Sequence, residues 1–262
     1  MVALSGSSGS SGLSAMLIYQ SLQKTGDKQM AQFKKDPQIA KEVDYFREQV
    51  GKIESVDEFI NDRRLMAFAL SAFGMEGELQ YLGRMRKVLS ESPANEDALV
   101  NKLIDPRFKE IASAFEFADK GLSKLESSTF VNSVVDRYYT NEFEVRLGEQ
   151  NPALREVAYF KRKIGNIKNT YNILGDQVLR EVVTSTFDLP KQIALQSVDK
   201  QKALIEARVD IEDFKDPEFV EKFAQRYLIK KDLEATQSGT GFSGGDSYLL
   251  SLFPSGGVSF LV

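Results

Sequence analysis

The sequence has 262 residues, of which 42% are hydrophobic, and this is enough to bury a substantial core in one large domain or two small ones. Cys and His are both absent, which excludes disulfides, thiolate sites, imidazole metal ligands and Ser-His or Cys-His catalysis. The 34 Lys+Arg and 38 Asp+Glu residues give a net charge of −4 with both signs interspersed, so the sequence lacks the one-sided basic field of a nucleic-acid-binding protein.

Residues 1–13 are rich in Ser and Gly. We expect them to be either a disordered N-terminus or an expression linker. The basic region of a secretory signal is missing, because the first Lys is Lys24, and no apolar stretch reaches the length of a membrane span. Residues 14–35 form an N-terminal helical segment, predicted as one or two short helices interrupted around Gly26.

The first helical module is predicted over 36–125. Its central stretch begins with Ser55 and Glu58, a capping box in which the serine oxygen accepts a backbone N–H and the glutamate returns to the cap. Asn61-Asp62 interrupts the apolar spacing that follows and can mark a break between two helices. Gly74 is a plausible residue to follow a helix end. The predicted helices of this module lie near 37–50, 56–73, 78–91, 95–104 and 106–118.

A connecting helix is predicted over 126–150, with Phe130, Val134, Tyr138 and Val145 on a face that packs against both modules. The second module covers 151–235. Strand-like alternation is scarce throughout, so the predicted fold class is all-α, with two tandem modules related by a repeat. The predicted helices of the second module lie near 152–164, 170–187, 192–208 and 217–234.

The two modules share a sequence pattern at an offset of 114 residues. The offset holds without a gap between Glu42–Met75 and Glu156–Leu189, with ten identities over 34 positions where average composition gives roughly two. This predicts a duplication. The identical pairs are Glu42/Glu156, Val43/Val157, Tyr45/Tyr159, Phe46/Phe160, Gly51/Gly165, Ile53/Ile167, Asp62/Asp176, Leu65/Leu179, Ser71/Ser185 and Phe73/Phe187.

Four predicted helix starts share the same pair of residues, an Asp or Asn followed by Pro. Asp36, Asp105, Asn151 and Asp216 each precede a Pro. The Asp or Asn side chain can cap a helix whose first residue is Pro, where the missing N–H costs nothing. We therefore interpret these pairs as start signals and assign them no function.

Residues 236–262 differ from the helical body: a Gly/Ser-rich linker leads to the short apolar stretches Tyr248–Phe253 and Val258–Val262. Such a segment can fold back on the core, add as a strand to a partner, or stay loose until assembly. The apolar side chains make the first stretch the predicted partner-binding element. Its candidate residues are Tyr248, Leu249, Leu250, Leu252 and Phe253.

Several motif matches fail on context. Gly239–Gly244 spells G-x-G-x-x-G but follows no strand, and S-x-x-K and K-T-G share Lys24. The acidic run from Asp210 has Phe214 and Lys215 where a calcium loop needs a ligand and a glycine. The basic cluster Arg84–Lys87 is interpreted as a solvated helix face, with an anionic contact as the alternative. We predict no catalytic, cofactor-binding or metal-binding residues and no cofactor.

The ordered segments SVDEFINDRRLMAFALSAFGM, FKEIASAFEF, EVAYFKRKIGNIKNTYNILGDQVLREVVTSTFDLP and DKQKALIEARVDIEDFKDPEFVEKFAQRY resemble an uncharacterised bacterial helical family encoded among flagellar genes. The resemblance covers most of 14–233, and family members also tend to end in a Gly/Ser-rich segment with an apolar tail. It implies a flagellum-associated protein and supplies no site residues.

Two classes of function remain. The first is a non-enzymatic structural or assembly protein of the flagellum, with flagellar structural or export components as partners and a location in the bacterial cytoplasm or at the flagellum. The second is a helical small-ligand-binding or enzymatic domain, for which the sequence offers only common carboxylates, Tyr and Lys. A general adaptor role is a further alternative. The sequence leaves the oligomeric state open.

Overall fold

The computed structural model describes residues 14–237, which form helices, turns and loops with no strand. The class is all-α, as predicted. The α-helices are α1 (Ala15–Phe33), α2 (Pro37–Val50), α3 (Val56–Asn61), α4 (Arg63–Ala72), α5 (Leu82–Ser90), α6 (Pro106–Phe115), α7 (Phe117–Lys120), α8 (Ser128–Gln150), α9 (Pro152–Lys163), α10 (Thr170–Gly175), α11 (Gln177–Thr186), α12 (Val198–Glu206) and α13 (Pro217–Gln237). Short 3₁₀ helices are η1 (Glu76–Gln80), η2 (Leu99–Asn101), η3 (Ile164–Asn166), η4 (Lys191–Leu195) and η5 (Ile211–Lys215).

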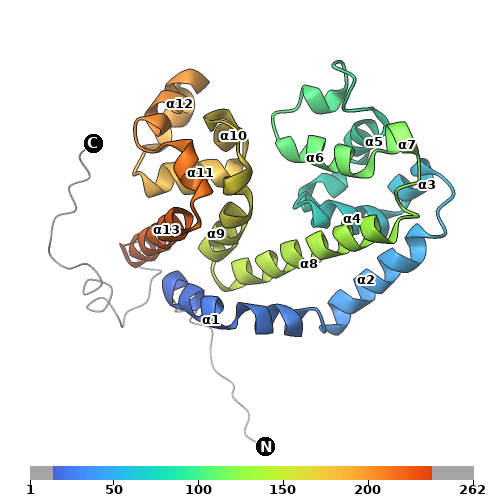
Figure 1. The fold of residues 1–262 in the computed structure, drawn as a ribbon, viewed down its shortest axis with the longest axis horizontal. Coiled ribbons are helices and arrows are strands. Elements are labelled where there is room, and N and C mark those ends of the chain that lie inside the picture. Colours follow the sequence, from blue (N-terminus) through green and yellow to red (C-terminus); the bar gives the residue numbers. More distant parts are fainter. Residues whose placement is uncertain (1–13, 238–262) are drawn as a thin grey trace, which may run out of the picture.

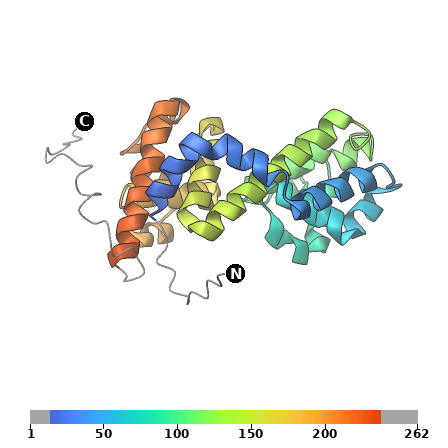
Figure 2. The same ribbon diagram turned by 90° about the horizontal axis from the view of Figure 1, so that it is seen from below.

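The helices gather around two separate apolar clusters, which define two lobes (Figure 1). Lobe 1 contains α2–α7 and the first half of α8, through Tyr138. Lobe 2 contains the end of α8, from Leu147, and α9–α13. The long helix α8 therefore runs through both lobes, and the lobes stand side by side along it (Figures 1 and 2).

The first helix packs on the last lobe. Ala15, Met16 and Tyr19 of α1 are buried in the cluster of lobe 2, next to α13 (Figure 2). The predicted interruption around Gly26 is wrong, because α1 is continuous. Gly26 costs the helix about 0.5–1 kcal/mol relative to Ala, and the burial of Met16, Tyr19 and Phe33 on either side offsets this cost.

The four predicted start signals are all helix caps. The side chains of Asp36, Asp105, Asn151 and Asp216 accept backbone N–H groups two residues ahead, at 2.9–3.0 Å. Ser55 also caps its helix, accepting the N–H of Glu58 at 3.1 Å. The capping box is incomplete, however, because the Glu58 carboxylate accepts the N–H of residue 54 instead of the cap residue.

Several predicted helices are divided in the structure. The predicted helices 56–73 and 170–187 each break at an Asp, Asp62 or Asp176, whose side chain caps the helix that follows. The predicted helix 106–118 breaks at Glu116, where φ is +51°. The predicted helix 78–91 divides at Tyr81 into η1 and α5, and 192–208 divides into η4 and α12. The predicted helix 95–104 forms turns and η2 instead of an α-helix.

Local contacts recur at the predicted offset of 114 residues. The Tyr45 hydroxyl donates to Asp62 at 2.9 Å, and the Tyr159 hydroxyl donates to Asp176 at 2.6 Å. Gly74 and Asp188, also 114 residues apart, both adopt positive φ, at +67° and +54°. Phe46 and Phe160 are both fully buried, whereas Phe73 is buried and Phe187 half-buried. These pairs support the predicted duplication, and superposition of the two lobes is its test.

Candidate functional site

A cleft of about 540 Å³ lies between the two lobes. Lobe 1 contributes the end of α4 and the start of α6, and lobe 2 contributes α9 and the start of α11, while α8 forms the floor. The polar and charged side chains that line it are Asp105, Arg107, Asn141, Glu149, Arg155, Glu156, Tyr159, Asp176 and Gln177. A cavity of this size falls within the range of small-molecule sites, about 300–1,000 Å³.

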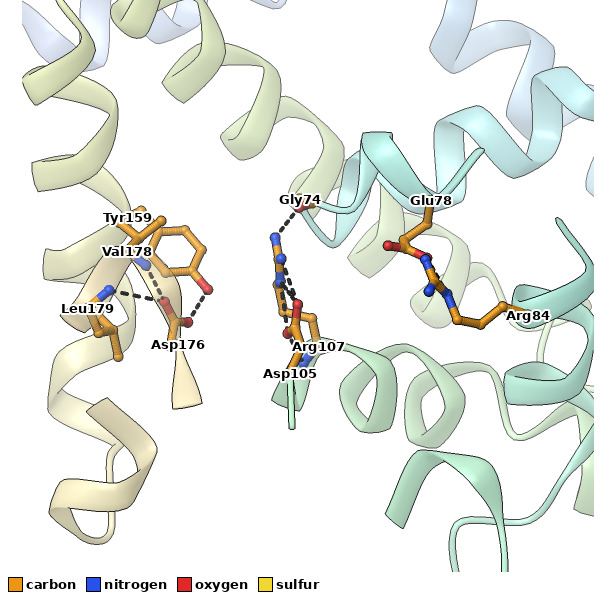
Figure 3. Close-up of polar contacts among 9 residues, drawn as sticks. All are labelled: Gly74, Glu78, Arg84, Asp105, Arg107, Tyr159, Asp176, Val178 and Leu179. Carbon is orange, nitrogen blue, oxygen red and sulfur yellow. Dashed lines mark hydrogen bonds and ion pairs between the residues drawn. The ribbon is translucent and has the colours of Figure 1, made fainter. Parts of the chain in front are cut away.

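The wall from lobe 1 is built around Arg107. Its Nε and Nη2 donate to the Asp105 carboxylate at 3.0 and 2.7 Å, and its Nη1 donates to the carbonyl of Gly74 (Figure 3). Burial opposes the ionised form of Asp105, but the hydrogen bonds from Arg107 outweigh it and hold the pKa of Asp105 below its ordinary value. The guanidinium is therefore fixed on the cap of α6 and on the turn that ends α4.

The wall from lobe 2 is built around Asp176. One carboxylate oxygen accepts the N–H groups of Val178 and Leu179, which caps α11, and the other accepts the Tyr159 hydroxyl. Figure 3 shows this group facing Arg107 across the cleft. Burial, followed by the negative charge of Asp176, raises the pKa of Tyr159 far above its ordinary value. Tyr159 is thus a fixed hydrogen-bond donor at every physiological pH.

The floor on α8 is polar and tied to lobe 1. Asn141 donates to Glu76 at 2.5 Å, and Ser71 donates to Glu142 at 2.5 Å. Burial raises the pKa of Glu142 above its ordinary value. Gly74 lies close to this floor, since a Cβ atom at this position would lie 3.2 Å from the side-chain oxygen of Asn141. These contacts hold the helix ends that shape the cleft.

The polar side chains of the cleft thus bond mainly to one another and to helix ends. Within residues 14–237, no group of three or more His, Cys, Asp or Glu side chains is placed to hold a metal ion. In the same range, no helix has both the length and the apolar character needed to cross a membrane. The chemistry available in the cleft is hydrogen bonding and ion pairing by carboxylates, guanidinium groups and a neutral phenol.

The basic cluster Arg84–Lys87 consists of separate ion pairs. Arg84 donates to Glu78 (Figure 3), and Arg86 donates to Asp57. Met85 between them is fully buried. The solvated-face interpretation accounts for these charges, because each arginine already has a carboxylate partner within lobe 1.

The acidic run from Asp210 is also structural. Asp210 caps η5, and Phe214 is buried against Phe160 and Phe223. The predicted partner-binding residues Tyr248, Leu249, Leu250, Leu252 and Phe253 lie outside the described residues. In the sequence, Tyr159 and Asp176 were identified only as repeat positions. The 17-residue spacing between them is the same as that between Tyr45 and Asp62, and this shared spacing is the signal that could have indicated a contact. Arg107 carried no such signal.

The chain was compared with known proteins. The family profile described as "Protein of unknown function (DUF1217)" matches residues 72–220. A crystal structure of a protein from Agrobacterium tumefaciens is similar, with 32% identity, a TM-score of 0.74, and coverage of 87% of this chain and 98% of the other. No curated protein matches the sequence. A profile match over more than half of the chain, together with this similar bacterial structure, shows that the chain belongs to the DUF1217 family of proteins of unknown function.

Proposed function

We propose that this protein is a non-enzymatic structural or assembly component of the bacterial flagellum that acts through protein–protein contacts. The non-enzymatic part of this proposal rests on the hydrogen bonds that polar side chains of the cleft make. Asp105 holds Arg107, and Asp176 holds Tyr159, so these groups fix helix ends. The motifs that resemble a family encoded among flagellar genes support the flagellar part, which rests on that resemblance.

The proposed partners are flagellar structural or export components, reached in the cytoplasm or at the flagellum. Tyr248–Phe253 is the proposed docking element, because an apolar segment after a Gly/Ser-rich linker can search for a partner edge or groove before losing its conformational freedom. The buried residues of the two apolar clusters within the described part of the chain run from Ala15 to Leu228, and the proposal is that folding rests on these. Recognition and folding are therefore assigned to different parts of the chain.

The test uses a motile bacterium that carries this gene. Deleting residues 238–262 should preserve the helical circular dichroism signal while reducing motility and the recovery of flagellar components by affinity capture. Substituting Leu249, Leu250 and Phe253 by Ser should reproduce the loss, and substituting Ser243, Ser247 and Ser251 by Ala is the matched control. Wild-type motility and capture for the truncated protein would rule out the docking role.

A small-ligand-binding role is the second candidate, and the size of the cleft favours it. A ligand held between Arg107 and Tyr159 would stabilise the folded state by mass action, about 2.7 kcal/mol at a concentration 100 times its Kd. Screening metabolites by thermal shift tests this candidate. A true ligand should lose its effect in Arg107→Ala and keep it in Arg84→Ala, which lies outside the cleft. A general adaptor role would instead show capture of partners unrelated to the flagellum.

A further inference from the structure

The two lobes meet through polar contacts on α8. The apolar cluster of lobe 1 ends at Tyr138, and that of lobe 2 begins at Leu147. Between them Asn141 and Glu144 are buried, and both bond to charged residues: Asn141 donates to Glu76, and Glu144 accepts from Arg162. The partly buried Tyr139 and Phe143 of this stretch pack on lobe 1 and lobe 2 respectively, so each lobe keeps its own apolar contacts and the residues buried between the clusters on α8 are polar.

One cluster of ion pairs bridges the lobes beside this stretch. Glu110 lies on α6 of lobe 1 and accepts a hydrogen bond from Lys163, at the end of α9 in lobe 2, at 2.6 Å. It also accepts one from Arg137 of α8 at 2.6 Å. The Lys163 and Glu110 side chains are only 23% and 31% exposed, so bulk water screens this pair less than a surface pair.

A second tie is weaker. Arg155 of α9 approaches Glu76 of η1 at 3.4 Å, and both side chains are about 40% exposed. Exposed pairs of this kind contribute roughly 0–1 kcal/mol. The Lys163–Glu110 pair is thus the stronger charged contact between α9 and lobe 1.

We propose that the lobes move relative to each other about the Tyr138–Leu147 stretch of α8, and that Lys163, Glu110 and Arg137 form a latch that sets the width of the cleft. Polar interfaces between compact units permit relative motion more readily than large apolar ones. The latch joins three elements, α6, α8 and α9, and lies outside the lining of the cleft, so breaking it leaves α8 and the link from α1 to α2 to connect the lobes. This inference stands independently of the flagellar role.

The absence of Cys from the sequence allows clean spin labelling. Ser113 on α6 and Ala203 on α12 are exposed and lie in different lobes, so Ser113→Cys with Ala203→Cys reports the distance between lobes by double electron–electron resonance. The distance distribution is measured in the otherwise unchanged full chain, in Lys163→Gln and in Glu110→Gln. Lys222→Gln is the matched control, because Lys222 pairs with Glu218 within α13 alone. Circular dichroism confirms that each variant remains helical.

Both latch variants should give longer and broader distances than the unchanged chain, and Lys163→Arg should restore the original distribution. Raising the salt to about 1 M, where the Debye length is about 3 Å, should broaden the distribution of the unchanged chain. The control should have no effect. A narrow distribution that stays the same in both variants and in high salt would overturn the proposal, as would an equal shift in Lys222→Gln.

Discussion

At the scale of single residues, the buried charges of this protein fasten helix ends. Asp62 and Asp176 each cap a helix and accept a tyrosine hydroxyl seventeen residues earlier in the chain. One side chain thereby satisfies two backbone N–H groups and a phenol. A break of this kind would weaken an isolated helix. Here the Asp carboxylate caps the helix after the break and also accepts the tyrosine hydroxyl, so the direction of the chain at the break is fixed.

Asp176→Ala should destabilise the protein by about 1–2 kcal/mol through loss of the cap, and by more if the buried Tyr159 hydroxyl stays unpaired. Asp62→Ala should cost less, because Tyr45 is only half-buried and can bond to water. Urea unfolding curves measure both changes. Asp216→Ala, an exposed cap without a tyrosine partner, serves as the control. Equal losses for all three variants would show that the tyrosine contacts contribute nothing.

Glu142 gives a prediction with a defined pH dependence. Its pKa is raised in the folded state, so folding disfavours the ionised form, and stability falls as the pH rises through the unfolded and then the folded pKa. Glu142→Gln keeps an acceptor for Ser71 and should be more stable than the unchanged chain at pH 7. The gain should vanish near pH 4, when Glu142 is mostly protonated. Urea curves at both pH values, with exposed Glu126→Gln as control, check this sign.

At the scale of elements, α1 depends on a residue from the far end of the fold. Asp232 on α13 accepts the Ser14 hydroxyl at 2.6 Å and the backbone N–H groups of Ala15 and Met16 at 2.7 and 3.1 Å. These N–H groups belong to the first turn of the helix, where backbone N–H groups have no acceptor within the helix itself. Tyr19 adds a second tie, since it donates to Glu221 and accepts from Lys161. Formation of the start of α1 is thus coupled to its docking on lobe 2.

Asp232→Ala should therefore loosen α1 selectively. We expect faster amide hydrogen exchange in α1 than in α8 and a loss of about 2 kcal/mol in unfolding free energy, the upper range for a helix cap. Glu234→Ala, two residues away and without a bond to α1, is the matched control. Unchanged exchange in α1 would show that its apolar packing alone holds it.

At the scale of the whole molecule, two apolar clusters share one chain and are joined by polar contacts. Each cluster has fully buried aromatic residues of its own, including Phe46 in lobe 1 and Phe160 in lobe 2. Since the two clusters have no buried residue in common, weakening one cluster should leave much of the other in place. The molecule is thus expected to unfold in two steps when the lobes differ in stability.

Phe160→Ala should cost about 3–5 kcal/mol, as buried Phe truncations do, and should make lobe 2 unfold before lobe 1. The chain has no Trp, so Tyr81→Trp and Tyr171→Trp provide fluorescence reporters, one in each lobe. Phe46→Ala is the mirror experiment and should reverse the order. A single coincident transition at both reporters in both variants would contradict independent lobes.

The sequence by itself determined the helical class, the four Asp/Asn-Pro helix starts and the 114-residue correspondence. These features depend on residues close together in the chain, where capping and periodicity operate. The sequence did not predict the breaks at Glu116, where φ is +51°, or around Gln196. Only the tertiary structure decided that α1 completes lobe 2, that Arg107 faces Tyr159 across a cleft, and that Lys163 reaches Glu110. The physical reason is that these pairs of residues lie from 52 to 218 positions apart in the chain, whereas capping and periodicity act over only a few residues.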